Sequence, residues 1–185
     1  MKKFLTLKHW QLFLLFSVIP VIFMITISNP TIMFTLFPIM AILLMGLCFA
    51  WIYSLGTNLH KKLPATVSMN ITWFKIVLFI PFAYMLFVSV FMYGMFPYIY
   101  SGGRPETPLI SALIFPLDML SMLCIIYCIY FNAKALKAAE WQRPVAFRDF
   151  AGEFFLISFF SIGVWIFQPR INKLFERNVG FVGQT

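Results

Sequence analysis

Residues 109–132 read LISALIFPLDMLSMLCIIYCIYFN, a stretch of 24 positions in which the one charged residue is Asp118. A helix that crosses a bilayer needs about 20 mostly apolar residues. The apolar side chains of this stretch are continuous, whereas those of a β-barrel strand would alternate with polar ones. Three further runs of the same kind lie at about 10–27, 32–55 and 73–99. The sequence therefore predicts four transmembrane helices.

The composition of the whole chain of 185 residues agrees with this interpretation. Hydrophobic residues make up 62% of the chain and charged residues 11%, whereas soluble domains contain about 45–50% and about 25% respectively. Disorder is excluded, because it requires low hydrophobicity. We therefore predict an all-α fold, a polytopic membrane helical bundle of two tandem hairpins.

The basic residues predict the orientation of the bundle, because Lys and Arg concentrate in cytoplasmic loops. Lys2, Lys3 and Lys8 precede the first apolar run, and Lys and Arg also cluster after the second and fourth runs, whereas the first and third links contain only Arg104. We expect both termini to be cytoplasmic and the membrane to be a bacterial inner membrane. The chain has a net charge of +8, and we expect its basic residues to contact anionic lipid headgroups. We do not expect nucleic acid as a partner.

The apolar run at 154–167 is the most ambiguous part of the chain. Runs of about 10–14 residues are more often re-entrant or interfacial than spanning. If this run does not cross, 13 of the 14 Lys and Arg lie inside; a fifth transmembrane helix, which is the alternative, would leave ten inside and four outside. We therefore divide the chain into a four-helix transmembrane domain (1–143) and a membrane-associated segment (144–185) that contains a short amphipathic helix.

A weak internal repeat relates the two predicted hairpins. Shifting the sequence by 78 positions aligns the segment 30–38, which begins and ends with Pro, with the segment 108–116. The alternative is two independent hairpins kinked by proline. The same shift places one set of small residues on another: Gly46, Ala50 and Ser54 on Cys124, Cys128 and Asn132. Small residues four apart let helices approach closely, so we expect both sets to face the bundle interior.

Asp118 is the strongest candidate for a functional residue within the predicted transmembrane helices. An ionisable group near the bilayer midplane is costly, and is a functional hypothesis by default. We predict an intramembrane polar stripe that also contains Ser121, Cys124, Cys128 and Asn132, because helical periodicity places these residues on one face. Two interpretations remain open: a path or pocket for an ion or polar substrate, and a protonated Asp118 that is hydrogen-bonded to Ser89 or Tyr84.

The remaining motifs indicate no catalytic residues, metal site or cofactor. The chain has two histidines, and its three cysteines all lie in apolar runs, so no zinc-type spacing is present. Five basic residues are expected at the membrane surface: Lys61, Lys62, Arg170, Lys173 and Arg177. We therefore expect a binding or accessory membrane protein that is not an enzyme, with the lipid bilayer and a second copy or another membrane protein as partners. The alternative is a small transporter or channel that uses the stripe around Asp118.

Overall fold

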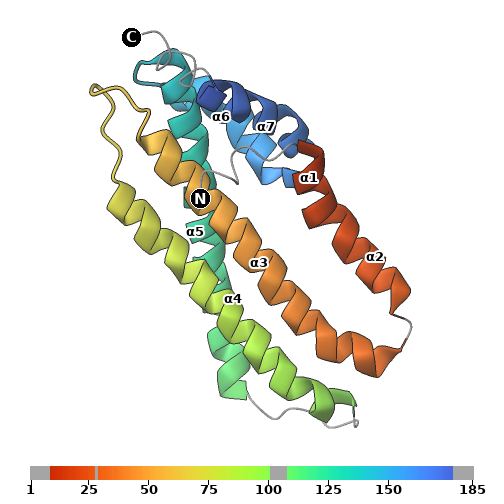
Figure 1. Cartoon of the computed structure of the whole chain (residues 1–185). Coiled ribbons are helices and arrows are strands. Elements are labelled where there is room, and N and C mark those ends of the chain that lie inside the picture. The colour runs from red at the N-terminus through yellow and green to blue at the C-terminus, as the bar shows by residue number, and fades with distance from the viewer. Residues whose placement is uncertain (1–8, 28, 101–107, 177–185) are drawn as a thin grey trace.

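The computed structural model describes residues 9–27, 29–100 and 108–176, and all of its regular elements in these ranges are helices. In chain order they are α1 (His9–Phe13), the π-helical turn η2 (Leu14–Val18), α2 (Ile19–Thr26), α3 (Pro30–His60), α4 (Ile71–Tyr100), α5 (Pro108–Trp141), α6 (Phe147–Ser158) and α7 (Phe160–Glu176). Figure 1 shows α3, α4 and α5 as a long antiparallel bundle with α6 and α7 at one end. The predicted all-α helical bundle is confirmed.

In the part of the chain that the structure describes, three helices are long and apolar enough to cross a membrane, over Leu36–His60, Ile71–Met95 and Ala112–Trp141. Each spans at least 25 residues, which at about 1.5 Å per residue exceeds a hydrocarbon core of about 30 Å. They correspond to the predicted runs 32–55, 73–99 and 109–132. Pro38 and Pro116, which defined the sequence repeat, both lie inside helices.

The first predicted run, 10–27, forms a helical arm that differs from the other three. Its apolar helix, Trp10–Thr26, is shorter than the three long helices. The arm consists of α1, η2 and α2; within the described residues its main contact with another element is that of α1 with α7, and Phe16 of η2 packs against the same core. By contrast, α4 and α5 pack closely together, so the two predicted hairpins are not packed alike. Crossing of the membrane by this arm stays a prediction.

The run at 154–167 does not form one straight helix. It is divided between α6 and α7, which meet at an angle of 119°. A Cβ atom on Gly163 would lie 1.6 Å from the carbonyl oxygen of Leu156, a distance that no side chain can occupy. Glycine at this position therefore allows α7 to begin directly against the last turn of α6. The bent pair has the form of the predicted re-entrant or interfacial segment, although a broken span would have the same form.

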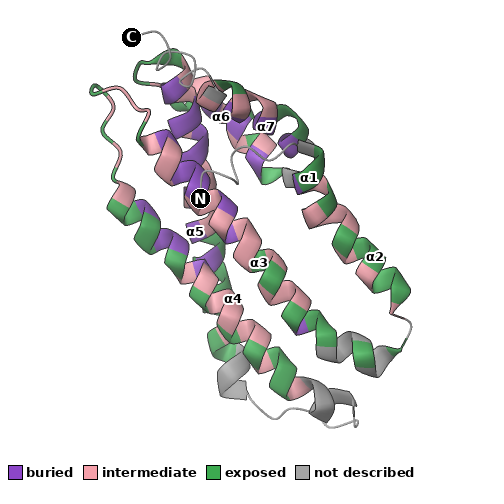
Figure 2. Ribbon diagram, in the orientation of Figure 1, coloured by how far each residue is buried: buried purple, intermediate pink, exposed green. Residues whose placement is uncertain are grey.

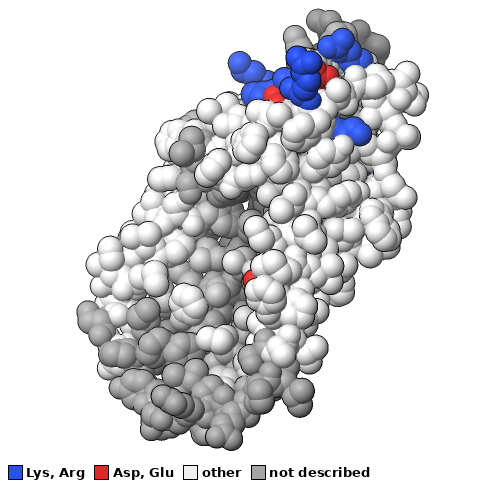
Figure 3. Space-filling model, turned by 180° about the vertical axis from the view of Figure 1, so that it is seen from behind, with Lys and Arg blue, Asp and Glu red and all other residues white. Residues whose placement is uncertain are grey.

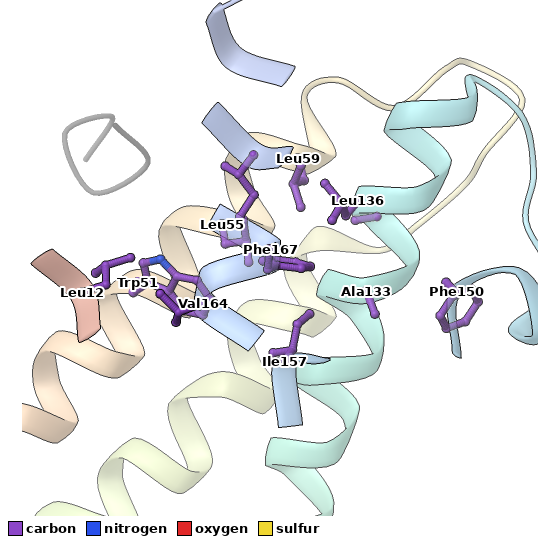
Figure 4. Packing of buried hydrophobic residues seen from close by; sticks show 12 residues of the cluster. Leu12, Trp51, Leu55, Leu59, Ala133, Leu136, Phe150, Ile157, Val164 and Phe167 are labelled. Carbon is purple, nitrogen blue, oxygen red and sulfur yellow. The ribbon is translucent and has the colours of Figure 1, made fainter. Parts of the chain in front are cut away.

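Burial is concentrated at the end of the bundle where α6 and α7 lie (Figure 2). We call this the basic end, because Lys and Arg gather there (Figure 3). Figure 4 shows its core, in which side chains from α1, α3, α5, α6 and α7 meet. Leu12, Trp51, Leu136 and Phe167 are each at most 2% exposed. Towards the other end large apolar side chains point outwards, as expected of helices surrounded by lipid.

Candidate functional site

A cluster of four charged side chains joins α5, α6 and α7 at the basic end. Glu153 Oε1 accepts hydrogen bonds from Lys137 Nζ and Arg170 Nη2, both at 2.9 Å. Arg170 also donates two bonds to Glu140, from Nε to Oε1 at 3.0 Å and from Nη2 to Oε2 at 2.5 Å. We call these four residues the charge cluster. It contains two carboxylates and two cations, so its formal charges cancel.

The local sequence explains how each member of the charge cluster is positioned. Lys137 and Glu140 are three residues apart on α5, so they lie on the same face of that helix. The first turn of α6 is closed by Asp149, whose Oδ2 accepts a hydrogen bond from the Ala146 N–H at 2.9 Å. The resulting start of α6 places Glu153 among the residues of that helix that are buried.

Burial and pairing act in opposite directions on Glu153. Burial would raise the pKa of this carboxyl group, but hydrogen bonds from Lys137 and Arg170 outweigh it, so the pKa of Glu153 lies below its usual value. The side chain of Glu153 is 6% exposed. A buried carboxylate is stable only when it is paired and hydrogen-bonded, so Glu153 depends on both cations.

A second set of contacts ties the link between α3 and α4 to α7. Lys62 Nζ donates a hydrogen bond to the carbonyl oxygen of Leu174 and lies 4.1 Å from the centre of the Phe175 ring. Leu174 is in the last turn of α7, where unpaired carbonyls carry partial negative charge that a cation stabilises. Burial lowers the pKa of Lys62. His60, the last residue of α3, also contacts this link, since its Nε2 atom and the carbonyl oxygen of Met69 are 2.8 Å apart.

The five basic residues predicted at the membrane surface therefore have different environments. Lys61 and Lys173 are exposed, as expected of surface residues. Arg170 and Lys62 are half-buried and bind other parts of the chain, and their position at the membrane surface stays a prediction. Arg177 lies outside the described residues.

The predicted polar stripe is divided between the interior and the surface. Ser121, Cys124, Cys128 and Asn132 are at most 7% exposed, whereas Asp118 is exposed. Asn132 Nδ2 donates a hydrogen bond to the Cys128 carbonyl oxygen at 2.9 Å. Within the described residues Asp118 has no hydrogen bond to Ser89 or Tyr84, and the Tyr84 hydroxyl instead contacts the Ile114 carbonyl oxygen at 3.4 Å.

The predicted small-residue contacts are only partly found in the interior. Ser54 is fully buried, whereas Gly46 and Ala50 are half-buried. A Cβ atom on Gly46 would meet nothing within 4 Å, so the predicted close packing at Gly46 is wrong. The close approach occurs at Gly56, where a Cβ atom would lie 2.6 Å from the Phe74 ring and 3.1 Å from Asn132 Oδ1. Gly56 is thus the glycine at which α3, α4 and α5 converge.

Sequence reasoning missed the charge cluster, although Glu153 offered a signal for it. This residue is acidic and directly precedes the apolar run 154–167, where an unpaired carboxylate would be costly. No group of three or more His, Cys, Asp or Glu that could hold a metal ion is found within residues 9–27, 29–100 and 108–176. The ion pairs of the charge cluster can hold α5, α6 and α7 together.

The chain was compared with models of known protein families, with curated proteins and with solved structures, and none of the three comparisons finds a match. The chain is a helical bundle, and the three long apolar helices of its described part are compatible with a membrane protein.

Proposed function

We propose that this chain is a multi-pass integral membrane protein that acts as a binding or accessory component and assembles with a second copy of itself or with another membrane protein. The proposal assigns no catalytic role to the chain. The observation that carries it is the arm formed by α1, η2 and α2, which is anchored at one end and, within residues 9–27, 29–100 and 108–176, has no closely packed helix along α2.

The anchor of the arm lies at the basic end. Leu12 is fully buried in the core there, and the Phe13 and Trp165 rings meet edge to face with their centres 5.7 Å apart. Helices in lipid associate by van der Waals packing rather than by a hydrophobic force. A helix that is fixed at its start and open along its length is therefore well placed to pack against a helix of another protein.

The turn η2 separates the anchored part of the arm from the open part. It is a π-helical turn of five residues, Leu14–Val18, and Pro20 follows it near the start of α2. Proline has no N–H with which to continue the helical hydrogen bonds, and π-helical turns occur frequently at functional sites. Both features support a role for α2 that differs from the role of the packed helices.

Photo-crosslinking in native membranes tests this assembly. A photoreactive residue replaces Ile25, which is 75% exposed on α2, and in a matched control it replaces Leu123, which is 65% exposed on α5. We expect discrete protein adducts from position 25 and lipid adducts from position 123. Two differently tagged versions of the chain, expressed together, distinguish a second copy from another protein. Lipid adducts alone at position 25 would contradict the proposal.

We also propose that the basic end faces the cytoplasm of a bacterial cell, which places the first link outside. The positive-inside rule supports this orientation, since the described Lys and Arg follow α3, begin α4, lie in the last part of α5 or just after it, or lie on α6 and α7. In a chain whose three native cysteines are replaced, we expect an impermeant maleimide to label Asn29→Cys in intact cells. Arg143→Cys should react only after permeabilisation, and the reverse pattern would invert the topology.

The alternative, a transporter or channel that uses Asp118, has less support. The four other residues of its polar stripe are buried, and Phe74 and Phe131 stack beside this part of α5 with ring centres 4.4 Å apart. The alternative predicts that Asp118→Asn abolishes flux while the protein still folds. The accessory role predicts that this variant assembles with its partner as the wild type does.

A further inference from the structure

We propose that the seam between α3 and α4 is a binding groove for one anionic phospholipid, with an acyl chain along the groove and the headgroup at Lys75. The groove has a volume of about 390 Å³. The residues that shape it include Gly46, Ala50 and Tyr53 from α3 and Lys75, Phe79 and Phe82 from α4. This inference concerns a different surface from the arm and does not depend on the proposed assembly.

The small residues of α3 create the groove. A Cβ atom on Gly46 would meet nothing within 4 Å, so this glycine leaves a hollow instead of bringing two helices together. Ala50, one turn further along α3, continues the hollow. The edge-to-face contact of Phe49 and Phe82, with ring centres 5.6 Å apart, holds the two helices together beside it.

The direction of the groove matches that of a lipid molecule. From Gly46 to Tyr53 it follows α3 for seven residues, or about 10 Å along the helix axis, towards the basic end. A smaller hollow that also includes Phe82 continues along the same seam towards the other end. An apolar channel of this shape, open to the bilayer, suits an acyl chain better than a rigid polar ligand.

Lys75 provides the charge complementarity. It is the one ionisable side chain with a full positive charge among the residues that line the groove, and it is exposed. Its Nζ lies 5.9 Å from the centre of the Tyr53 ring, and within the described residues no carboxylate forms an ion pair with it. Lysines near the membrane surface attract anionic headgroups. The free cation at the mouth of an apolar groove therefore favours an anionic lipid over a zwitterionic one.

Thermal unfolding of the full chain in detergent tests the proposal, with phosphatidylglycerol or phosphatidylcholine of identical chains added. We expect half-maximal stabilisation of the wild type at a concentration of phosphatidylglycerol about fivefold lower than that of phosphatidylcholine, since one lysine near the surface has an effect of this order. Lys75→Gln should remove this preference. Lys61→Gln, which changes an exposed lysine at the same end outside the groove, should retain it. Inorganic phosphate should not reproduce the effect, because it has no chain.

A second variant tests the apolar part of the groove. Gly46→Leu fills the hollow and should weaken the stabilisation by both lipids, and Ala50→Val serves the same purpose if Gly46→Leu does not fold. The proposal is overturned if the wild type shows no preference between the two lipids, if Lys75→Gln retains the preference, or if the filled groove responds to lipid as the wild type does.

Discussion

Arg170 on α7 binds Glu140 on α5 through one edge of the guanidinium group, with Nε 3.0 Å from Oε1 and Nη2 2.5 Å from Oε2. The same Nη2 also reaches Glu153 on α6. One side chain therefore connects three helices, and it does so with the forked geometry that Arg has and Lys lacks. The angle between α6 and α7 is thus tied to the end of α5.

Replacing Arg170 by Ala should destabilise the protein by about 2 kcal/mol. This is less than the loss of one partner from a fully buried pair costs, because the Arg170 side chain is 30% exposed. Arg170→Lys should recover part of the loss, since it restores the charge without the fork. Arg148→Ala, at an exposed position of α6, is the control. Thermal unfolding in detergent measures all three variants, and equal melting temperatures for Arg170→Ala and Arg148→Ala would show that the charge cluster contributes nothing.

The stability of the protein should fall at acidic pH because of Glu153. The folded-state pKa of this carboxyl group lies below its usual value, so the stabilisation is fully present above the usual value and is lost as the pH falls from there through the lower folded-state pKa. We expect Glu153→Gln to be less stable than the wild type at pH 7. The difference in melting temperature should shrink as the pH falls below about 5, and a constant difference down to pH 3 would show that ionisation of Glu153 does not matter.

Gly163→Ala should disturb the junction between α6 and α7. The added methyl group would lie 1.6 Å from the Leu156 carbonyl oxygen, so the backbone must move, at a cost of about 1–3 kcal/mol. Gly152→Ala, where a Cβ atom meets nothing within 4 Å, should be neutral or stabilising by about 0.5–1 kcal/mol. Melting temperatures of the two variants give the comparison, and an unchanged value for Gly163→Ala would contradict the close contact.

A matching pair of variants examines the centre of the bundle. Gly56→Ala places a methyl group 2.6 Å from the Phe74 ring, and that ring is fully buried and stacked on Phe131. Overpacking of this kind costs about 1–3 kcal/mol. Gly46→Ala enters open space and should stabilise slightly. If the two variants unfold at the same temperature, the convergence of three helices at Gly56 is not tight.

The sequence predicted the class of fold and the position of three long helices, because lipid requires long apolar segments that satisfy their own backbone hydrogen bonds. It could not predict which side of each helix faces inwards. In a soluble helix polar residues mark the outside, but in these helices both the packed side and the lipid side are apolar. Gly46 and Gly56 therefore offer similar signals, and only their neighbours in space distinguish a groove from a contact.

The charge cluster and the bend were harder to predict for a different reason. Glu153 meets partners 16 residues before and 17 residues after it in the chain, and pairs at such separations leave no periodic pattern. The break within 154–167 arises from one close backbone contact at Gly163. The short length of this run did indicate that it would not form a straight crossing helix, but not where it would divide.

The charge cluster also bears on the order in which the chain is synthesised. Lys137 and Glu140 leave the ribosome before Glu153 and Arg170, and because they are three residues apart on one helix face they can neutralise each other during insertion of α5. In the folded chain Lys137 is bonded to Glu153 and Glu140 to Arg170, so both residues of α5 have partners that are synthesised later. The two charges that α5 contributes to the cluster therefore cancel before the C-terminal helices are synthesised.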